Sequence, residues 1–451
     1  MSGKIAASLA TAAAEVRFAG NGGHHLTIGP GEPAISEWAT AGLTLPDLPA
    51  MRRYRIDRVT AQLATQGYDG IIVMDPMNIR YVTDTTNMQL WVMHNGARYA
   101  FVSADGHVIL WDYYGCDYLA GHSAVIDEVR PAIGSTYFLA GPRHAEQATR
   151  WTNEMIAVIT EHCGPNPRIA VDQCHHLGYR LLEDAGVRVG FGQEVMELAR
   201  SIKGADEILA MRCAINACET TMAEMHTALE PGMTERELWA LLHAGNIRRG
   251  GEWIETQIIA SGPRTNPWMQ EASSRVIEPG DIVAYDTDLV GAYGMMVDIS
   301  RTWIAGEGRG AGGSPTTEQE HTYGLACAQI EHNMALLTPG RSFRDLTFES
   351  TFPDPKHYRH YSCLFHGVGQ CDEYPEIYFP EIWDEWGFDG QLDVGMVLTV
   401  ESYVGPRSAA GANRWAEGVK LENQVLVTAD GPELLTRFPL GLQICAGAAD
   451  S

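Results

Sequence analysis

The spacing of apolar residues divides the chain into segments with helical and with strand periodicity. Apolar residues between about 51 and 70 recur at helical spacing, which predicts a helix that ends near Gly70, followed by a buried strand. A turn is expected at Asp75-Pro76. Two apolar runs around Asp105-Gly106 predict a β-hairpin, and residues 166–186 predict a strand and then a helix. This alternation indicates an α/β domain at 46–204.

The pattern changes after residue 204. A long helical pattern ends before Pro231-Gly232, and a second helix follows with Thr234 as N-cap and Glu237 in the capping-box position. A further helix is expected at about 317–337, among short strands separated by Gly and Pro turns. These elements predict an α+β domain at 205–451. Residues 1–45 are rich in Gly, Ala and Pro and are expected to form an irregular arm.

Charge and cysteine content narrow the class of protein. The formal net charge of the 451 residues is −25, which argues against nucleic acid or an anionic membrane surface as partner. No apolar run approaches the ~18 residues that a membrane span needs. The nine cysteines form no CxxC pair and their number is odd, so a reducing, cytoplasmic compartment is expected. The alanine-rich segment near the N-terminus is interpreted as a frayed leader.

Four segments of the second domain place acidic side chains or a histidine among apolar residues: DTDLVGAYGMMVDISRT, LFHGVG, LTVESY and VKLEN. An ionised carboxylate in apolar surroundings is strongly unfavourable unless it is paired or binds a metal. The nearest basic residues are only Arg301 and Lys420. Carboxylates with one imidazole suit a pair of divalent cations. The candidate metal ligands are Asp286, Asp288, Asp298, His366, Glu401 and Glu422.

Each of these residues also has an ordinary explanation. A single aspartate in a hairpin most often belongs to a turn or a solvated edge, and Glu422 alone could be an exposed strand residue. The ordered combination of all six is much harder to reach by chance, which favours the metal site. Arg301 in DISRT is expected to orient a carboxylate ligand rather than to touch a substrate.

The four segments resemble the pita-bread superfamily of creatinases, prolidases, aminopeptidases P and methionine aminopeptidases. PGDIVAYDTDLVGAYGMMVDISRTW is similar to its first metal segment, HGVG to its histidine segment, and VES and VKLEN to its glutamate segments. Hydrolases of this fold have a histidine seven residues after the metal-binding one, and another in the segment similar to IIASGPRTNPWMQ. Glu373 and Trp268 stand at these places, which argues against ordinary peptidase activity.

The segments DPMNIRYVTDTTNMQLWVMHN, NIRRGGEWIETQIIASGPRTNPWMQE and CLFHGVGQCDE resemble a narrower family, the dimethylsulfoniopropionate (DMSP) lyases of the DddP type. This resemblance implies two divalent metal ions, iron first, with Mn, Co or Zn as alternatives. It implies Asp372 as the catalytic base and Tyr361 as a catalytic, substrate-binding residue. A homodimer is expected by analogy with creatinases. The loop between Glu401 and Glu422 is longer than the resemblance leads us to expect.

The implied reaction agrees with the residue types. Cleavage of zwitterionic DMSP to dimethyl sulfide and acrylate is a β-elimination, in which a carboxylate base removes the proton next to the substrate carboxylate. Asp372 stands beside a second acid, Glu373, which raises a carboxyl pKa. Trp91, Trp268 and Tyr361 are candidate contacts for the sulfonium cation, although each could be a core aromatic. The alternatives are an Xaa-Pro peptidase or creatinase-like hydrolase, a lyase-like paralogue with another small substrate, and a non-catalytic binding protein.

Overall fold

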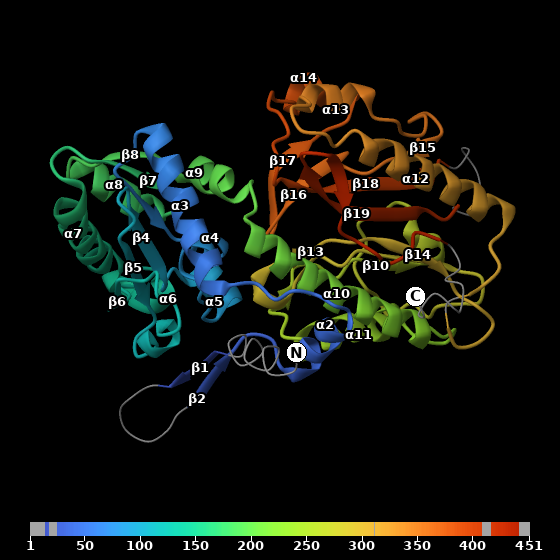
Figure 1. Ribbon diagram of the computed structural model, residues 1–451, viewed down its shortest axis with the longest axis horizontal. Helices are drawn as coiled ribbons and strands as arrows, with labels where there is room; N and C mark the ends of the chain where they lie inside the picture. Colours follow the sequence, from blue (N-terminus) through green and yellow to red (C-terminus); the bar gives the residue numbers. More distant parts are fainter. Residues whose placement is uncertain (1–13, 18–24, 311, 408–415, 442–451) are drawn as a thin grey trace.

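The computed structural model describes residues 14–17, 25–310, 312–407 and 416–441. It has two domains that lie side by side, connected by residues 201–204 between helices α9 and α10 (Figure 1). Most of the predicted leader lies outside the described residues, as does the 408–415 part of the long loop between Glu401 and Glu422.

The N-terminal domain is built on a six-stranded mixed sheet with the order β6-β5-β4-β3-β7-β8. Its strands are β3 (Gly70–Val73), β4 (Tyr99–Ser103), β5 (Val108–Asp112), β6 (Glu128–Pro131), β7 (Arg168–Val171) and β8 (Arg188–Phe191). Its helices are α3 (Leu48–Gln66), α4 (Pro76–Thr83), α5 (Gln89–Asn95), α6 (Tyr137–Ala140), α7 (His144–Cys163), α8 (His176–Asp184) and α9 (Gly192–Arg200). Apolar side chains of α3 and α9 form a core with the sheet, and those of α7 form another.

Local sequence explains most of these boundaries. Asp47 caps α3 by accepting a hydrogen bond from the Ala50 amide, and Gly67 ends the helix with a φ of 69°. The hairpin predicted around Asp105-Gly106 is confirmed, because β4 and β5 pair antiparallel there. The turn predicted at Asp75-Pro76 is wrong. Asp75 instead caps α4 by accepting hydrogen bonds from two amides of its first turn, and the proline occupies that first turn, where no amide hydrogen is needed.

The second domain places long helices over three small sheets. Its helices are α10 (Ala205–Ala228), α11 (Glu235–Arg248), α12 (Thr317–Ala335), α13 (Phe343–Glu349) and α14 (Trp383–Trp386). The capping box predicted for α11 is confirmed, since the Thr234 hydroxyl accepts a hydrogen bond from the Glu237 amide and the Glu237 carboxylate accepts one from the Thr234 amide. Helix α10 packs on a core shared with strands of the sheet around β11, and α12 covers β18 and β19.

The strands of the second domain form the orders β10-β11-β14, β13-β12-β9 and β17-β16-β18-β19-β20, with β15 paired to β18. They are β9 (Trp253–Ile254), β10 (Ile259–Ser261), β11 (Ile282–Tyr285), β12 (Leu289–Val290), β13 (Met296–Val297), β14 (Arg301–Ile304), β15 (Tyr358–Arg359), β16 (Phe365–Val368), β17 (Asp372–Ile377), β18 (Val397–Pro406), β19 (Val419–Thr428) and β20 (Gly431–Leu434). The whole is a pita-bread arrangement of helices around sheets, preceded by an α/β domain, as the sequence predicts.

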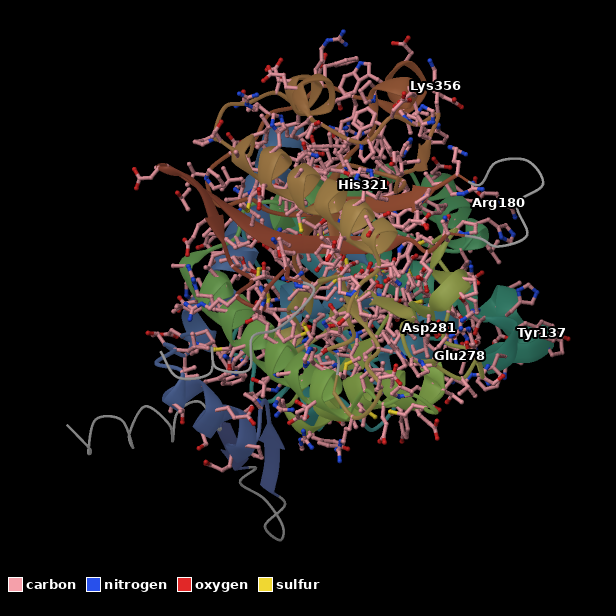
Figure 2. All side chains as sticks on the ribbon, turned by 90° about the vertical axis from the view of Figure 1, so that its right-hand side faces the viewer. Tyr137, Arg180, Glu278, Asp281, His321 and Lys356 are labelled. Atoms are coloured by element: carbon pink, nitrogen blue, oxygen red, sulfur yellow. The ribbon has the colours of Figure 1, made fainter. Side chains whose placement is uncertain are left out.

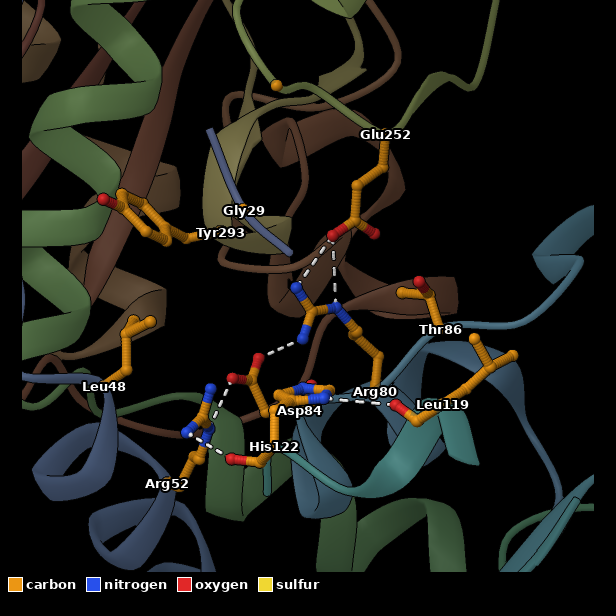
Figure 3. A pocket seen from close by; sticks show the side chains of 11 residues that line it. Gly29, Leu48, Arg52, Arg80, Asp84, Thr86, Leu119, His122, Glu252 and Tyr293 are labelled. Atoms are coloured by element: carbon orange, nitrogen blue, oxygen red, sulfur yellow. Dashed lines mark hydrogen bonds and ion pairs between the residues drawn. The ribbon is translucent and has the colours of Figure 1, made fainter. Parts of the chain in front are cut away.

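Buried ion pairs fix the two domains to each other. Arg80 of α4 pairs with Asp84 and, at 2.8 Å, with Glu252 of the second domain, and Figure 3 shows its guanidinium between the two carboxylates. Arg52 pairs with the same Asp84 at 2.6 Å. These contacts line a cavity of about 240 Å³ between the domains.

The first 45 residues are more ordered than the sequence indicates. The strands β1 (Ala14–Arg17) and β2 (His25–Ile28) pair with each other, and α2 (Glu32–Thr40) buries Trp38 against the core of the second domain. The expectation of an irregular arm is therefore wrong for these segments. No helix in the described parts of the chain is long and apolar enough to cross a membrane.

Candidate metal centre

Strand pairing brings the histidine and the two glutamates of the predicted site together. His366 lies in β16, Glu401 in β18 and Glu422 in β19. The register of β18 and β19 sets Glu401 directly opposite Glu422. Because such paired residues carry their Cβ atoms about 4.5–5.5 Å apart, the two carboxylates share one site on the sheet. Both glutamates are fully buried, and His366 is nearly so.

The three aspartates reach the same place from the two three-stranded sheets. Asp286 follows β11, Asp288 precedes β12 and Asp298 follows β13, and all three are buried. Asp288 has a φ of 34°, a left-handed conformation that is uncommon outside glycine. Such a conformation persists only where surrounding contacts hold it. Here the Thr256 hydroxyl donates a hydrogen bond to the Asp288 carboxylate.

His366 lies close to both the aspartates and the glutamates of the predicted site. Its Nε2 atom lies 3.5 Å from Asp298 Oδ2, 3.4 Å from Glu401 Oε1 and 3.8 Å from Glu422 Oε1. The potential ligand atoms of the three aspartates lie within 4.8 Å of one another, and so do those of His366, Glu401 and Glu422. The structure thus gathers all six predicted ligands into one buried cluster, which we call the carboxylate cage.

The ammonium group of Lys420 lies inside the cage. The Nζ atom of fully buried Lys420 is 3.1 Å from Asp286 Oδ2, 2.7 Å from Glu401 Oε2 and 3.2 Å from Glu422 Oε2. It also donates a hydrogen bond of 2.6 Å to the Ser300 hydroxyl, which in turn donates one of 2.9 Å to Glu422. A single ammonium compensates only part of the charge of five buried carboxylates.

Burial and mutual repulsion therefore perturb the cage acids. Burial raises the pKa of Asp288 and of Glu422 well above the usual range, and the charge of Asp286 raises both further. Burial likewise raises the pKa of Asp298, and Glu422 adds to this. Asp286 differs, because burial is opposed by the Lys420 ammonium together with hydrogen bonds from neighbouring side chains, and these lower the pKa of this carboxyl.

The donor atoms of the cage fit metal ions. Asp298 Oδ1, Glu422 Oε1 and both carboxylate oxygens of Glu401 are buried and accept no hydrogen bond in the described structure. A buried polar atom left in this state is costly, and a carboxylate more so. Oxygen-rich ligation with one imidazole suits divalent ions such as Fe, Mn, Co or Zn. The roles of the six residues as ligands remain a prediction, supported by their convergence and by these unsatisfied oxygens.

Asp372 and Tyr361 lie at the entrance to the cage. Both line a cavity of about 420 Å³ together with His366, and Asp372 Oδ1 is 3.6 Å from His366 Nδ1. Desolvation and the cage acids raise the pKa of Asp372 against an opposing effect of His366, and its 56% exposure lets solvent moderate the shift. The Tyr361 ring lies 4.5 Å from Lys420 Nζ, and burial keeps its hydroxyl protonated by raising the pKa.

Glu373 has a different environment from the one its sequence position suggests. Its carboxylate is buried and lies 3.1 Å from Arg200 Nε and 2.9 Å from Lys203 Nζ. It also accepts a hydrogen bond of 2.9 Å from the Gln370 amide. The charge of Glu373 does raise the pKa of Asp372, as expected, but burial and the charges of Asp286 and Glu401 are larger causes, and two cations compensate the Glu373 carboxylate.

The three candidate aromatic contacts occupy different places. Trp268 is 7% exposed and stacks on Tyr403, with ring centroids 6.0 Å apart. It lines a cavity of about 280 Å³ to which Tyr361 also contributes. Trp91 lies on α5 of the N-terminal domain and lines another cavity, so within this single chain it is not brought together with the other two. Its role in substrate binding stays a prediction.

Arg301 acts differently from its predicted role, and Lys420 has contacts that were not predicted from the sequence. Arg301 holds no carboxylate ligand. Its guanidinium donates instead to backbone carbonyls, including that of Glu422 at 2.5 Å, and so fixes the strand rather than the ligand. Lys420 was identified from the sequence only as a nearby basic residue, but in the structure its ammonium contacts the carboxylates of three cage residues. The spacing of Lys420 and Glu422 could have indicated these contacts, since alternate residues of a strand face the same side of the sheet.

Comparisons with known proteins agree on the architecture. Residues 210–429 match the family described as metallopeptidase family M24, and residues 55–202 match the creatinase/prolidase N-terminal domain. The Xaa-Pro dipeptidase of Bacillus anthracis has a similar structure, with a TM-score of 0.65 and 21% identity over 87% of this chain and 99% of that one. This likeness shows the shared fold.

Two relatives are much more similar in sequence. The dimethylsulfoniopropionate lyase DddP of Roseovarius nubinhibens is 44% identical over 93% of this chain and 93% of its own length. The protein of the same name from Roseobacter denitrificans is 41% identical over 92% of each chain. Identity at this level spans both domains and the interval that contains the carboxylate cage.

Proposed function

The chain belongs to the family of the dimethylsulfoniopropionate lyase DddP, and from this premise we propose that it cleaves DMSP to dimethyl sulfide and acrylate. The reaction we infer is a metal-dependent β-elimination. The observation that carries this proposal is the position of Asp372, a partly exposed carboxylate at the entrance to the buried cage.

The six cage residues would hold two divalent ions, with iron as the first candidate and Mn, Co or Zn as alternatives. When bound, such a metal pair supplies Lewis-acid stabilisation for the negative charge that develops on the substrate carboxylate. The oxygens of Asp298, Glu401 and Glu422 that accept no hydrogen bond in the described structure support this assignment, because ion pairs with Lys420 and His366 compensate only part of the charge of these carboxylates.

Asp372 takes the proton from the carbon next to the substrate carboxylate. The electron pair of that C–H bond forms the new carbon–carbon double bond, and the C–S electron pair leaves with neutral dimethyl sulfide. A raised pKa makes Asp372 a stronger base than an ordinary aspartate, and its exposure leaves it reachable by substrate. The Tyr361 hydroxyl stays protonated, so it serves as a hydrogen-bond donor rather than as a base.

Aromatic surfaces suit the other end of the substrate. A sulfonium cation is attracted by ring faces, with about 0.5–2 kcal/mol per well-placed ring. Tyr361 faces both the catalytic cavity and the cavity lined by Trp268, so these two rings are the best supported contacts.

The environment of Glu373 argues against the hydrolase alternative. Arg200 and Lys203 neutralise this carboxylate and bury it, so it is not free to handle a substrate as the histidine of the hydrolases does. A paralogue that eliminates from another small β-substituted carboxylate keeps the same requirements and is an outcome of the test. A non-catalytic binding protein would not need a base at the entrance to the cage, so the position of Asp372 argues against this alternative.

The test is release of dimethyl sulfide from DMSP by the metal-loaded protein, measured by gas chromatography beside an Xaa-Pro dipeptide. We expect dimethyl sulfide and no dipeptide cleavage. Dipeptide cleavage without dimethyl sulfide would refute the proposal in favour of the hydrolase. Inactivity on DMSP with elimination from another β-substituted propionate would identify the paralogue.

We further propose that the protein is a homodimer in the cytoplasm. Tyr114, Tyr137 and Phe138 are 84%, 71% and 73% exposed, and Figure 2 shows Tyr137 at the outer edge of the N-terminal domain. Trp91 makes edge contacts with Phe138 and with Tyr113, which extends this aromatic patch. Exposed aromatic clusters of this kind are typical of interfaces. The eight described cysteines are all free thiols, which supports a reducing compartment.

A further inference from the structure

A second cavity adjoins the catalytic one. It has a volume of about 280 Å³, and we call it the Arg359 pocket. Its walls include Arg359, Arg407 and the rings of Trp268, Tyr361 and Tyr403. It shares Met269, Tyr361 and Ser362 with the catalytic cavity, so the two spaces are neighbours separated by common side chains.

Among the described residues, Arg359 has no ion-pair partner. Its Nε atom is buried without a hydrogen bond, and no carboxylate in the described parts of the chain pairs with its guanidinium. The fully buried arginines of the interdomain region differ, as Arg55 lies 2.7 Å from Glu207 Oε1. Burial of a cation without an acceptor is unfavourable, because the desolvation of the charge is not compensated. In a chain with a net charge of −25, an unpaired arginine beside an acidic cage is a distinct feature.

The pocket walls are held in place by the fold. Arg359 lies in β15, where its backbone is in register with Gly405 of β18. The Tyr403 hydroxyl donates a hydrogen bond of 2.9 Å to the Thr265 carbonyl, which fixes the ring on which Trp268 stacks. The fixed aromatic rings and the guanidinium without an ion-pair partner form a preorganised site for a ligand.

We propose that the Arg359 pocket is an anion subsite that binds a small monocarboxylate. A guanidinium pairs with a carboxylate through two parallel hydrogen bonds, which matches an acceptor that the protein itself does not supply. The aromatic walls accommodate a short apolar or cationic tail. The carboxylates of the cage repel an anion, whereas the Arg359 pocket binds the anion next to the reaction site.

This inference rests on the proposed function for the identity of the ligand, because DMSP and acrylate are both monocarboxylates. The pocket would receive the substrate as it arrives and the product as it leaves. Binding itself requires no turnover, so it can be tested independently of lyase activity.

The test compares propionate with the neutral, equally sized propionamide by titration calorimetry on the metal-loaded protein. Wild type, Arg359→Met, Arg359→Lys and the surface control Arg143→Met are measured. Arg143 is an exposed arginine of the N-terminal domain, paired with Glu146. We expect Arg359→Met to raise the Kd of propionate about tenfold or more and to leave that of propionamide unchanged. Arg359→Lys should recover part of the affinity, and Arg143→Met should match wild type.

Each possible result either supports or overturns the proposed anion subsite. Equal propionate affinity in wild type and Arg359→Met overturns the subsite, because the anion then binds elsewhere, for example at the metals. Equal affinity of propionate and propionamide in wild type also overturns it. If propionate depends on Arg359 but DMSP releases no dimethyl sulfide, the subsite stands and the lyase proposal fails. If both hold, Arg359→Met should raise KM for DMSP about tenfold or more and change kcat little.

Discussion

Lys420 Nζ lies 2.7 Å from Glu401 Oε2 in a cluster that is otherwise acidic. Both side chains are fully buried. The ammonium therefore lies beside buried carboxylate oxygens that are candidate metal ligands. Lys420 Nζ also lies 3.1 Å from Asp286 Oδ2 and 3.2 Å from Glu422 Oε2, so one ammonium compensates part of the charge of three carboxylates.

Replacement of Lys420 should destabilise the metal-free protein more than the metal-loaded one. Lys420→Met leaves Asp286, Glu401 and Glu422 without their shared cation, and breaking a buried pair in this way costs about 3–5 kcal/mol. Divalent metal should restore a large part of the loss. Thermal unfolding with and without a chelator measures the difference. Lys420→Arg is the conservative control, and equal losses in both states would contradict the role.

Replacement of Asp372 should separate catalysis from metal binding. Asp372→Asn keeps the shape and removes the base, so kcat should fall about 10²- to 10⁴-fold. Metal content should not change, because Asp372 is 56% exposed and lies outside the six-residue cage. Glu376→Gln is a matched control, since Glu376 lines the same cavity. Elemental analysis and the dimethyl sulfide assay are run on the same samples, and near-normal turnover in Asp372→Asn would exclude it as the base.

Much of the second domain was predictable from sequence because its signals are local. Thr234 and Glu237 mark the start of α11 by a capping box. The gathering of the six cage residues could be expected because charged groups among apolar strand residues need a common partner. The turn predicted at Asp75-Pro76 failed because aspartate before proline suits a turn and a helix N-terminus equally.

Pairings between distant segments could not be predicted. Glu373 meets Arg200 and Lys203 from about 170 positions earlier in the chain, and only the fold brings these residues together. That Arg359 has no ion-pair partner among the described residues is equally invisible in the sequence, because it depends on which side chains the fold places beside it. Helix α2 was missed although Ala34, Ile35 and Trp38 share one buried face.

Loss of the Glu373 carboxylate should reduce stability. Glu373→Gln leaves Arg200 and Lys203 buried with less compensation, at a cost of about 3–5 kcal/mol in the free energy of unfolding. Burial opposes ionisation, but Lys203 and Arg200 lower the pKa of Glu373. The carboxylate therefore stabilises the fold above about pH 4.3 and loses this effect as pH falls through the lowered pKa. Urea unfolding at neutral pH measures the loss.

The control for this measurement is an exposed pair. Arg212 and Glu433 are 2.5 Å apart but their side chains are 26% and 42% exposed. Glu433→Gln should therefore cost less than about 1 kcal/mol. A similar effect of both substitutions would show that the Glu373 cluster is not a buried ion network of the expected strength.

A charge placed in the aromatic patch should dissociate the proposed dimer. Phe138 is 73% exposed and contacts Trp91 edge to face at 6.2 Å. Phe138→Asp puts a carboxylate where a partner would bury apolar surface, so light scattering after size-exclusion chromatography should show about half the wild-type mass. Phe348→Asp changes an exposed aromatic of the second domain and should leave the mass unchanged. A monomeric wild type would contradict the proposal directly.

Metal uptake should release protons, and affinity should rise with pH. Burial opposes protonation of His366, but Asp372 and Glu401 outweigh it and raise the pKa of the imidazole to about 9, so the metal-free protein holds this proton at pH 7. The raised pKa values of Asp288, Asp298 and Glu422 add to the protons that bound metal displaces. Titration calorimetry with manganese in two buffers of different ionisation enthalpy counts the protons. Because His366 loses its proton as pH approaches 9, its competition with the metal weakens and the apparent affinity increases over that range. Uptake without proton release would show that the cage is already ionised and held together by another cation.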